Sequence, residues 1–451
     1  MKIAIVGSGI SGLAVAHLLR GQAELTLFEA GDYFGGHTHT VDLRLDGPTG
    51  AVTHGVDTGF LVFNERTYPQ LIKLLAELNV ATVKSDMSFS VQVPGARQGG
   101  PLEWSGSSLS TVFAQRGNLA NPRFLRMLRD VLRFNRLASA LAERGQEAEL
   151  MQPLLDFLRQ HDLSDEFRDW YFLPMLGCIW SCPIDQMLRF PVATMIRFCH
   201  NHGLLQVTNR PQWWTVAGGA RHYVDKIVAQ IADKRLRTPV QRISRDAQGV
   251  LISSGGQTER FDKVVLASHS DQSLALLQDA SWLERKTLGA IRYQPNRAVL
   301  HTDSSVLPQQ RRAWAAWNYQ RASLAQGRQQ SAGARQDEAR VCLHYLINKL
   351  QPLPFTQPVL VSLNPLEEID PRQIHASFDY AHPVFDVAAI RAQGQLPTLQ
   401  GQQSTYFCGA WTGYGFHEDG LKSGLDVAAR LQALLANPEQ IPTPAPARLV
   451  A

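Results

Sequence analysis

The sequence contains no long hydrophobic run. Its apolar runs fall well short of the roughly 20 residues that a membrane-spanning helix needs, and its mean hydropathy is -0.16. We therefore expect no segment that crosses a membrane. A β-type run begins at residue 3, directly after the first Met, and leaves no space for a signal peptide ahead of it. The expected location is the cytoplasm, with the inner face of the membrane as an alternative.

Cysteine is scarce, with five residues in a chain of 451. An odd number of cysteines without paired Cys-x-x-Cys knuckles predicts neither a disulfide framework nor a structural metal site. Cys178 and Cys182 are one helical turn apart. We interpret them as two small apolar residues of one helix, with a redox pair as the alternative.

No charge of one sign is in large excess, since 44 Lys and Arg face 40 Asp and Glu, a formal net charge of +4. The 44% hydrophobic and 19% charged residues are ordinary for a globular protein and exclude a fibrous or largely disordered chain. No aromatic and basic recognition surface accompanies the arginines, so we expect no nucleic-acid partner. A chain of this length predicts two intergrown domains.

The first residues form a strand, turn and helix pattern. A β-branched run at residues 2–6 leads into Gly7-Ser8-Gly9-Ile10-Ser11-Gly12 and then into an apolar helix. Gly7 permits the tight turn, Gly9 lets the backbone approach a pyrophosphate, and Gly12 lets the helix pack close to the strand. The helix amides and the positive end of the dipole then face the phosphates. The pattern predicts a dinucleotide site.

A second β-type run ends at Glu29, where an acid accepts hydrogen bonds from an adenosine ribose. A paired-glycine loop, Gly35-Gly36-His37-Thr38, follows closely, and an ordinary NAD site has no such loop. Here the sequence resembles the FAD-binding domain of the flavin amine oxidase, phytoene desaturase and protoporphyrinogen oxidase superfamily, whose Gly-Gly-Arg loop follows the acid. His37 stands in the Arg position. The resemblance implies a non-covalent FAD.

The C-terminal residues 405–424 resemble the flavin motif of the same superfamily. A short strand leads into a glycine-rich loop, and we predict a helix that starts near Asp419 or Gly420. In that motif the amides at the helix start meet the flavin pyrimidine. Ala410-Trp411 replaces the usual Asp after the first glycine. The resemblance assigns these cofactor-binding residues: Gly7, Gly9, Ser11, Gly12, Glu29, Ala30, Gly35, Gly36, His37, Thr38, Val240, Ala267, Gly409, Gly420 and Leu421.

The resemblance implies an α/β fold in which a Rossmann-like FAD-binding domain is discontinuous in sequence and carries an inserted α+β substrate or cap domain. The predicted FAD-binding domain comprises residues 1–85, 205–275 and 400–440. The cap domain comprises 86–204 and 276–399, and 441–451 form a C-terminal tail.

The catalytic candidates are a separate set of five residues. Residues proposed to face the flavin are Trp411, Tyr414, His417 and His382, with either histidine as a general base or as a structural residue. Arg297 aligns with the lysine that holds a water near flavin N5 in amine oxidases.

Segments at 56–64, 344–351 and 363–365 resemble a narrower group of mostly uncharacterised bacterial NAD/FAD-binding proteins, some linked to desaturation of methylated fatty acyl chains. The resemblance implies an FAD-dependent oxidoreductase that takes hydride onto flavin N5 from a hydrophobic lipid chain. The alternatives are an amine oxidase acting on a small amine or polyamine, and a flavin-binding redox protein without turnover. The electron acceptor stays open between oxygen, a quinone and a protein.

Residues 122–144 contain arginines at spacings of three or four, with leucine and phenylalanine between them. This pattern predicts a basic amphipathic helix. One interpretation is a cap helix with its apolar residues in the domain core, and the other is a helix that contacts an anionic membrane surface. The aromatic residues between Trp170 and Trp180 likewise either line an apolar tunnel or form core.

Overall fold

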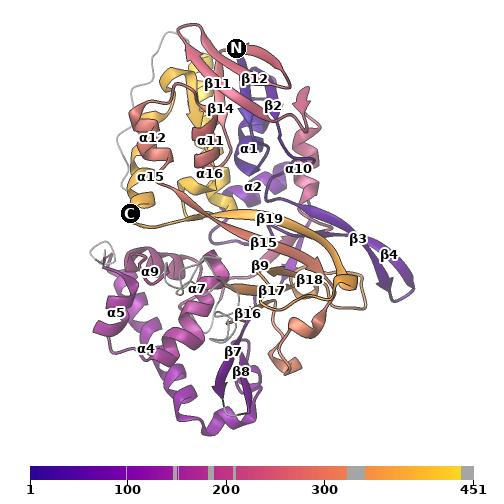
Figure 1. Ribbon diagram of the computed structural model, residues 1–451, viewed down its shortest axis with the longest axis vertical. Coiled ribbons are helices and arrows are strands. Elements are labelled where there is room, and N and C mark those ends of the chain that lie inside the picture. The colour runs from indigo at the N-terminus through magenta and orange to yellow at the C-terminus, as the bar shows by residue number, and fades with distance from the viewer. Residues whose placement is uncertain are drawn as a thin grey trace.

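The computed structural model describes residues 1–97, 99–145, 150, 152–180, 187–206, 210–321 and 341–437. Cys182 and the predicted tail at 441–451 lie outside these residues. The chain forms two lobes, each built around its own sheet (Figure 1). Among the described helices, none combines the length and the apolarity that crossing a membrane requires.

The upper lobe contains a five-stranded parallel sheet in the order β10-β2-β1-β14-β20. Its strands are Lys2–Val6 (β1), Glu24–Phe28 (β2), Asp233–Arg235 (β10), Lys263–Leu266 (β14) and Thr405–Phe407 (β20). Nearly all residues of β1 and β14 are buried, as central strands of a parallel sheet require. Segments from the beginning, middle and end of the chain therefore share one sheet.

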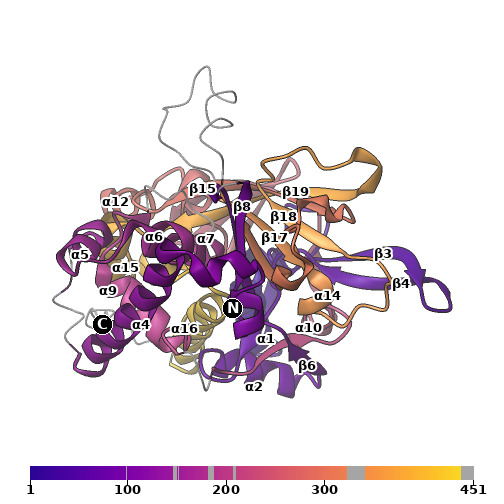
Figure 2. The same cartoon turned by 90° about the horizontal axis from the view of Figure 1, so that it is seen from below.

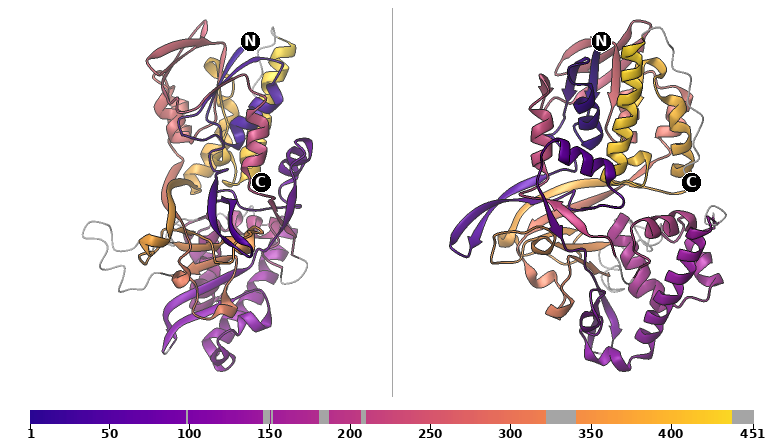
Figure 3. Two further views of the ribbon diagram at one scale, coloured as in Figure 1. Left: turned by 90° about the vertical axis from the view of Figure 1, so that its right-hand side faces the viewer. Right: turned by 180° about the vertical axis from the view of Figure 1, so that it is seen from behind.

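Two helices cover one face of this sheet, α1 (Ile10–Leu19) and α16 (His417–Ala436), which lie side by side (Figure 3). A Cβ atom added at Gly424 would lie 2.3 Å from the carbonyl oxygen of Ser11. The close approach of the two helices therefore requires glycine at this position.

The other face of the parallel sheet is covered by helices α11 (Ser270–Leu276), α12 (Trp282–Leu288) and α15 (Val387–Leu399) and by the meander β11 (Val240–Asp246), β12 (Gly249–Ser254) and β13 (Gln257–Phe261). Leu288, Ala389 and Leu396 pack there in one hydrophobic core with Phe407 of β20. Helices α12 and α15 fall within residues 276–399, which were predicted to belong to the cap domain, but they pack on the parallel sheet of the upper lobe. A parallel sheet needs both faces covered, and these helices supply part of that cover.

The lower lobe contains a seven-stranded mixed sheet in the order β19-β15-β18-β17-β16-β7-β8. Its strands are Phe89–Arg97 (β7), Gly100–Ser105 (β8), Arg292–His301 (β15), Trp317–Gln320 (β16), Cys342–Leu346 (β17), Leu360–Leu363 (β18) and Ile374–Val384 (β19). The antiparallel pair β15 and β19 lies where the two lobes meet (Figure 1). This position brings the end of β19 next to the upper lobe.

Helices form one side of the lower lobe: α4 (Pro122–Glu143), α5 (Leu154–Gln160), α6 (Asp165–Phe167), α7 (Leu173–Trp180) and α9 (Val192–Asn201). The helix predicted at 122–144 is thus confirmed in type and extent. The remaining strands are Thr40–Gly47 (β3), Gly50–Asp57 (β4), Phe63–Asn64 (β5), Thr82–Ser85 (β6) and Trp213–Val216 (β9). Helices Pro69–Glu77 (α2) and Arg221–Val228 (α10) belong to the upper lobe.

Candidate active site

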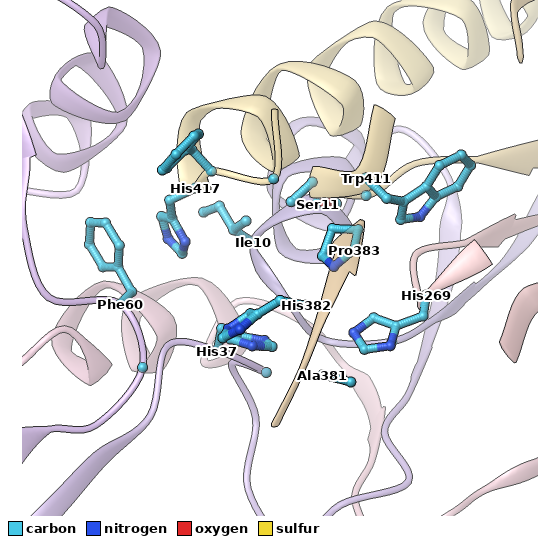
Figure 4. Close-up of a pocket in the computed structure, with 18 of the residues that line it drawn as sticks. Ile10, Ser11, His37, Phe60, His269, Ala381, His382, Pro383, Trp411 and His417 are labelled. Carbon is cyan, nitrogen blue, oxygen red and sulfur yellow. The ribbon is translucent and has the colours of Figure 1, made fainter. Parts of the chain in front are cut away.

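A cavity of about 750 Å³ lies between the two lobes (Figure 4). Every predicted cofactor-binding residue lines it except Gly12, Thr38, Gly420 and Leu421. Of the predicted catalytic residues, Trp411, Tyr414, His417 and His382 line it. The tertiary fold therefore brings the beginning and the end of the chain together around one space.

The first glycine loop has the geometry that its sequence predicts. Gly7 has a φ of +104°, and a Cβ atom there would lie 2.8 Å from the carbonyl oxygen of Ala267. A Cβ atom at Gly12 would lie 2.0 Å from the carbonyl oxygen of Gly7. Only glycine fits these two positions, because one needs a positive φ and the other direct backbone contact.

Gly9 differs from its neighbours because no atom lies within 4 Å of the place that its Cβ would take. It is also the N-cap of α1, and no side chain caps the helix there. The amides of the first turn of α1 therefore border open space in the cavity wall. This is the arrangement that binds a pyrophosphate, and it fits the ADP half of FAD.

Glu29 ties the first glycine loop to the second. Its carboxylate accepts hydrogen bonds from the amide of Ser8 at 3.0 Å and from the amide of Gly31 at 2.8 Å. The hydroxyl of Ser8 donates to the same carboxylate and accepts from the amide of Gly35 at 3.1 Å. A Cβ atom at Gly36 would lie 3.1 Å from the Cα of Gly9. The two loops therefore form one rigid cradle.

Four histidines, His37, His269, His382 and His417, surround the centre of the cavity (Figure 4). Burial lowers the pKa of His37 and of His417 to about 3 and that of His382 to about 4. All three are therefore neutral at physiological pH. The Nε2 atom of His37 is buried without a hydrogen-bond partner among the described residues. That free polar atom is available to a bound cofactor and suits the place that Arg holds in the resembling family.

His382 is held by Asn296 on the neighbouring strand. The Nδ2 atom of Asn296 donates to the carbonyl oxygen of Gln294 and lies 3.0 Å from Nδ1 of His382. The Oδ1 atom of Asn296 accepts from Asn364 at 2.7 Å, so the amide orientation is fixed. Since Nδ1 of the neutral imidazole accepts, its proton lies on Nε2. His382 is therefore a hydrogen-bond donor at Nε2.

His417 is the first residue of α16. Its Nε2 atom lies 2.7 Å from the hydroxyl of Tyr223, and its ring stacks on Phe60 with the centroids 3.9 Å apart. The Tyr223 hydroxyl also hydrogen-bonds to Thr38. Thr38 therefore contacts His417 both through Tyr223 and directly, with Oγ1 3.5 Å from Nε2, and does not itself line the cavity.

The C-terminal helix begins at His417, not at Asp419 or Gly420 as predicted. The carboxylate of Asp419 accepts from the amides of Tyr414 and Phe416 at 3.1 and 3.0 Å, and so folds the preceding loop back onto the first turn. The amide of Gly420 donates to the carbonyl oxygen of Phe416, and Leu421 is buried in the upper core. Neither Gly420 nor Leu421 lines the cavity, and His417 is the residue of the first turn of α16 that does.

Trp411 lines the cavity but is fixed as a structural residue. Its indole Nε1 donates to the carbonyl oxygen of Ser268 at 3.1 Å, and its own carbonyl oxygen accepts from Gln393. The ring covers Gly409, where a Cβ atom would lie 2.3 Å from the indole nitrogen. The indole nitrogen and the carbonyl oxygen of Trp411 therefore both have hydrogen-bond partners within the protein.

The prediction for Arg297 is wrong. Its side chain is exposed and does not line the cavity, whereas its strand neighbour Asn296 is 2% exposed. Consecutive residues of a strand point to opposite faces, and at this point of β15 the side chain of Asn296 is buried whereas that of Arg297 is in solvent. The sequence reasoning also missed His269 and Asn296, because neither belongs to a motif.

The far end of the cavity is mainly apolar, and the one histidine there, His202, stacks on Phe198 and has its pKa lowered by burial to about 4. Its lining comes from both lobes: Leu61, Val62, Met87, Cys178, Ile179, Trp180, Phe198, Leu204, Trp213, Trp317, Tyr345, Phe385 and Phe416. From the predicted aromatic cluster, Ile179 and Trp180 line it, whereas Trp170 and Phe172 are core. Among the described lining residues there is no Lys, Arg or Asp, and Glu29 of the cradle is the only acid.

Cys178 is the only cysteine among the described lining residues, and it lies at this apolar end. Burial raises its pKa well above the usual range of a thiol. A buried neutral thiol is a poor nucleophile. The cradle itself contains no cysteine, which agrees with a non-covalent cofactor.

A two-loop dinucleotide cradle that closes onto a glycine-rich C-terminal helix defines a flavin-dependent oxidoreductase. The sequence matches the profile of the family described as flavin containing amine oxidoreductase over residues 10–308, so the chain belongs to this family and is an FAD-dependent enzyme. No match was found among the curated proteins.

Several solved structures share the fold. A CLA-producing fatty acid isomerase from P. acnes has 16% sequence identity and a TM-score of 0.64, and the match covers 95% of this chain and 98% of that one. Cyclohexylamine oxidase from Brevibacterium oxydans IH-35A has 17% identity and a TM-score of 0.66, with coverages of 97% and 99%. Putrescine oxidase bound to putrescine has 15% identity and a TM-score of 0.64, with coverages of 96% and 99%. These likenesses establish the fold and include proteins named for both fatty acids and amines.

Proposed function

We propose that the enzyme removes two hydrogens from a hydrophobic acyl chain, as one hydride and one proton, and leaves a carbon–carbon double bond. The observation that carries the proposal is the uncharged far end of the cavity. In this family the FAD supplies the acceptor for the hydride. The protein binds and orients the chain, excludes water and handles the proton.

The apolar lining suits a chain without charge. A cationic amine or a free carboxylate that entered the far end would lose its hydration, and the described lining there has no Lys, Arg, Asp or Glu to form an ion pair with it. A long acyl chain has no such cost, because the aromatic and aliphatic side chains replace water around it. A polar head group would then stay outside this part of the cavity.

The histidines define the polar part of the reaction site. His382 presents a donor at Nε2 and is not placed to act as a base in this tautomer. His417 shares its Nε2 with Tyr223, whose hydroxyl continues to Thr38. We assign to this three-residue chain the removal of the proton, because it links the cavity to further proton-carrying hydroxyls. A weak base is sufficient, since loss of hydride makes the neighbouring C–H group strongly acidic.

Amine oxidation is the second candidate, and the relatives that share the fold are the observation that favours it. A buried lysine close to the cofactor would support it. The described lining contains no lysine, and Arg297, the residue aligned with it, is exposed and is not among the lining residues. The structure therefore favours the acyl chain.

The two candidates are separated by anaerobic mixing of the purified holoenzyme with unsaturated phospholipids, methylated and unmethylated, and in parallel with a panel of amines. We expect the visible flavin band to bleach with a lipid, and mass spectrometry to show the loss of two hydrogens from the acyl chain. Bleaching by amines alone would overturn the proposal. If neither class bleaches the flavin, the redox protein without turnover replaces it.

A variant tests the role of the far end directly. Ile179→Trp would fill part of the apolar lining with a larger side chain while leaving the cradle intact. We expect the wild-type flavin content, with flavin reduction by lipid slowed by about tenfold or more, the effect of a misplaced substrate. Unchanged reduction by lipid would show that the chain does not occupy this end.

A further inference from the structure

Large apolar side chains are exposed in one region of the lower lobe. The described residues contain seven exposed large hydrophobic side chains, and four of them lie between residues 109 and 132. They are Leu109, Leu119, Leu125 and Leu132, with exposed fractions of 80%, 54%, 43% and 48%. Such a concentration on a short segment needs an explanation, because isolated exposed leucines are ordinary but grouped ones mark contact sites.

Helix α4 shows how the sequence produces this surface. Its inner face buries Phe124, Met127 and Phe134 in the core of the lower lobe. Positions 122, 125, 126, 129, 132, 133 and 136 are exposed, and their spacing of three or four places them on one outer face. This outer face contains leucine as well as arginine. The expectation that the apolar residues of this helix lie in the core therefore fails for Leu125 and Leu132.

The same surface has excess positive charge. Asp130 is fully buried and is held by Arg133 at 2.9 Å and by the amide of Ser164. The carboxylate of Glu166 forms an ion pair with Arg123. Within the part of the chain that the structure describes, no ion pair includes Arg126 or Arg136. Their charges therefore face solvent without a protein counter-charge.

We define the leucine–arginine surface by nine exposed residues of consecutive segments: Leu109 of the short helix Leu109–Val112 (α3), Arg116 and Leu119 of the turn Arg116–Ala120 that packs on α4, and Leu125, Arg126, Arg129, Leu132, Arg133 and Arg136 of α4 itself. Seen from the end of the lower lobe, α4 lies beside α6 on this part of the molecule (Figure 2).

We propose that the leucine–arginine surface docks the enzyme on an anionic lipid bilayer. Arginine guanidinium groups bind lipid phosphates through charge-assisted hydrogen bonds, and leucines between them enter the head-group region. A protein partner fits less well, because the leucines are interspersed with arginines rather than gathered into an apolar core. Nucleic acid fits less well, because the surface has no exposed aromatic residue for stacking.

The surface is connected to the cavity through one helix. Helix α4 packs on α9, and α9 contributes Phe198 to the apolar end of the cavity. The helices of the lower lobe that would meet the membrane therefore also contribute to the apolar end of the cavity. The inference stands on exposure and charge alone and does not depend on the proposed reaction.

The test is co-sedimentation of the purified full-length holoenzyme with two kinds of vesicle, phosphatidylcholine alone and phosphatidylcholine mixed with phosphatidylglycerol in equal parts. We expect clear binding to the anionic vesicles, weaker binding to the neutral ones, and a decrease with added salt. The double variant Arg126→Gln/Arg136→Gln should weaken binding to anionic vesicles by about fivefold for each arginine. Leu119→Ser/Leu125→Ser should weaken binding to both kinds.

Trp282→Ser is the matched control, because Trp282 is 71% exposed but lies on α12 in the upper lobe. It should leave vesicle binding unchanged. Wild-type flavin content and melting temperature in every variant would show that folding is intact. Equal binding to both vesicles, no binding to either, or an equal loss in Trp282→Ser would overturn the proposal. Vesicle binding is measured without turnover. A negative binding result would therefore not contradict the proposed reaction, and a failure of the proposed reaction would not contradict membrane docking.

Discussion

The amide of Asn296 fixes the tautomer of His382 from the neighbouring strand of the lower sheet. Asn296 Nδ2 lies 3.0 Å from His382 Nδ1, and Asn364 holds the other end of the same amide. The strands concerned, β15 and β19, lie where the two lobes meet. Asn296, a residue of the seven-stranded sheet in the lower lobe, therefore determines which ring nitrogen of His382 carries the proton.

This relationship predicts different effects for the two residues. His382→Phe should keep FAD but slow its reduction by substrate by about a hundredfold, the usual effect of removing a positioned hydrogen-bond donor from a reaction site. Asn296→Leu should slow reduction by about tenfold, because His382 remains but its tautomer is no longer fixed. Rapid-mixing absorbance measures both rates.

The exposed Arg297 provides the control, since Arg297→Gln should leave the rate of reduction within about twofold. If Arg297→Gln were as slow as Asn296→Leu, the assignment of the inner and outer faces of β15 would be wrong.

The open space at Gly9 predicts a selective loss of cofactor. Gly9→Val adds a side chain where no protein atom lies within 4 Å, so the fold should persist. The added methyl groups would occupy the place of the phosphates, and FAD affinity should fall by at least about tenfold. The flavin-to-protein absorbance ratio after purification measures this loss.

Gly394→Ala is the control for the Gly9 substitution. Gly394 lies in α15 with nothing within 4 Å of its added Cβ. The change should keep the flavin and raise stability by up to about 1 kcal/mol through helix propensity. A Gly9→Val protein with full flavin content would contradict the cradle described above.

A buried ion pair joins α12 to the meander of the upper lobe. The guanidinium of Arg245 lies 2.5 Å from the carboxylate of Glu284, with side chains 1% and 4% exposed. Arg245→Met would leave Glu284 buried without its partner and should lower the free energy of unfolding by about 3 kcal/mol or more. Urea unfolding followed by circular dichroism measures the change.

The exposed pair Arg260 and Asp246, at 2.7 Å, serves as the comparison. Arg260→Met should leave the free energy of unfolding almost unchanged, because solvent screens this pair. Similar losses in both variants would show that burial does not set the strength of the Arg245 pair.

Two histidines buried in the lower sheet predict acid sensitivity. His301 and His344 share the hydroxyl of Ser362 at 2.7 and 2.6 Å, and burial lowers their pKa values to about 4 and about 3. The unfolded chain binds protons near the ordinary histidine pKa of about 6.5, whereas the folded protein does not. Stability is therefore complete above that pH and falls as the pH decreases from about 6.5 to 4, by up to about 1.4 kcal/mol per pH unit for each histidine.

Urea midpoints measured across this pH range test the effect. His344→Gln should flatten the pH dependence even though it lowers stability at neutral pH. An unchanged slope in this variant would rule out His344 as a source of the acid sensitivity.

The wrong assignment of Arg297 shows that the sequence of a strand does not by itself tell which of its side chains are buried. Residues 296 and 297 differ by one position, yet one faces inward and the other faces solvent. Register decides the face, and register depends on pairing with β18 and β19, which begin more than 60 residues later. The late start predicted for the C-terminal helix has a related cause, because the Asp419 carboxylate reaches back to amides that precede it.

The sequence by itself determined the FAD cradle, because Gly7, Gly12 and Glu29 act through local backbone geometry that a short motif specifies completely. It also determined the basic helix at residues 122–143, since helical spacing is a local property. Only the tertiary structure decided which histidines meet, that Asn296 is buried while Arg297 is exposed, and that α12 and α15 cover the parallel sheet. These depend on contacts between residues far apart in the chain, and burial in the space they enclose sets the protonation of each histidine.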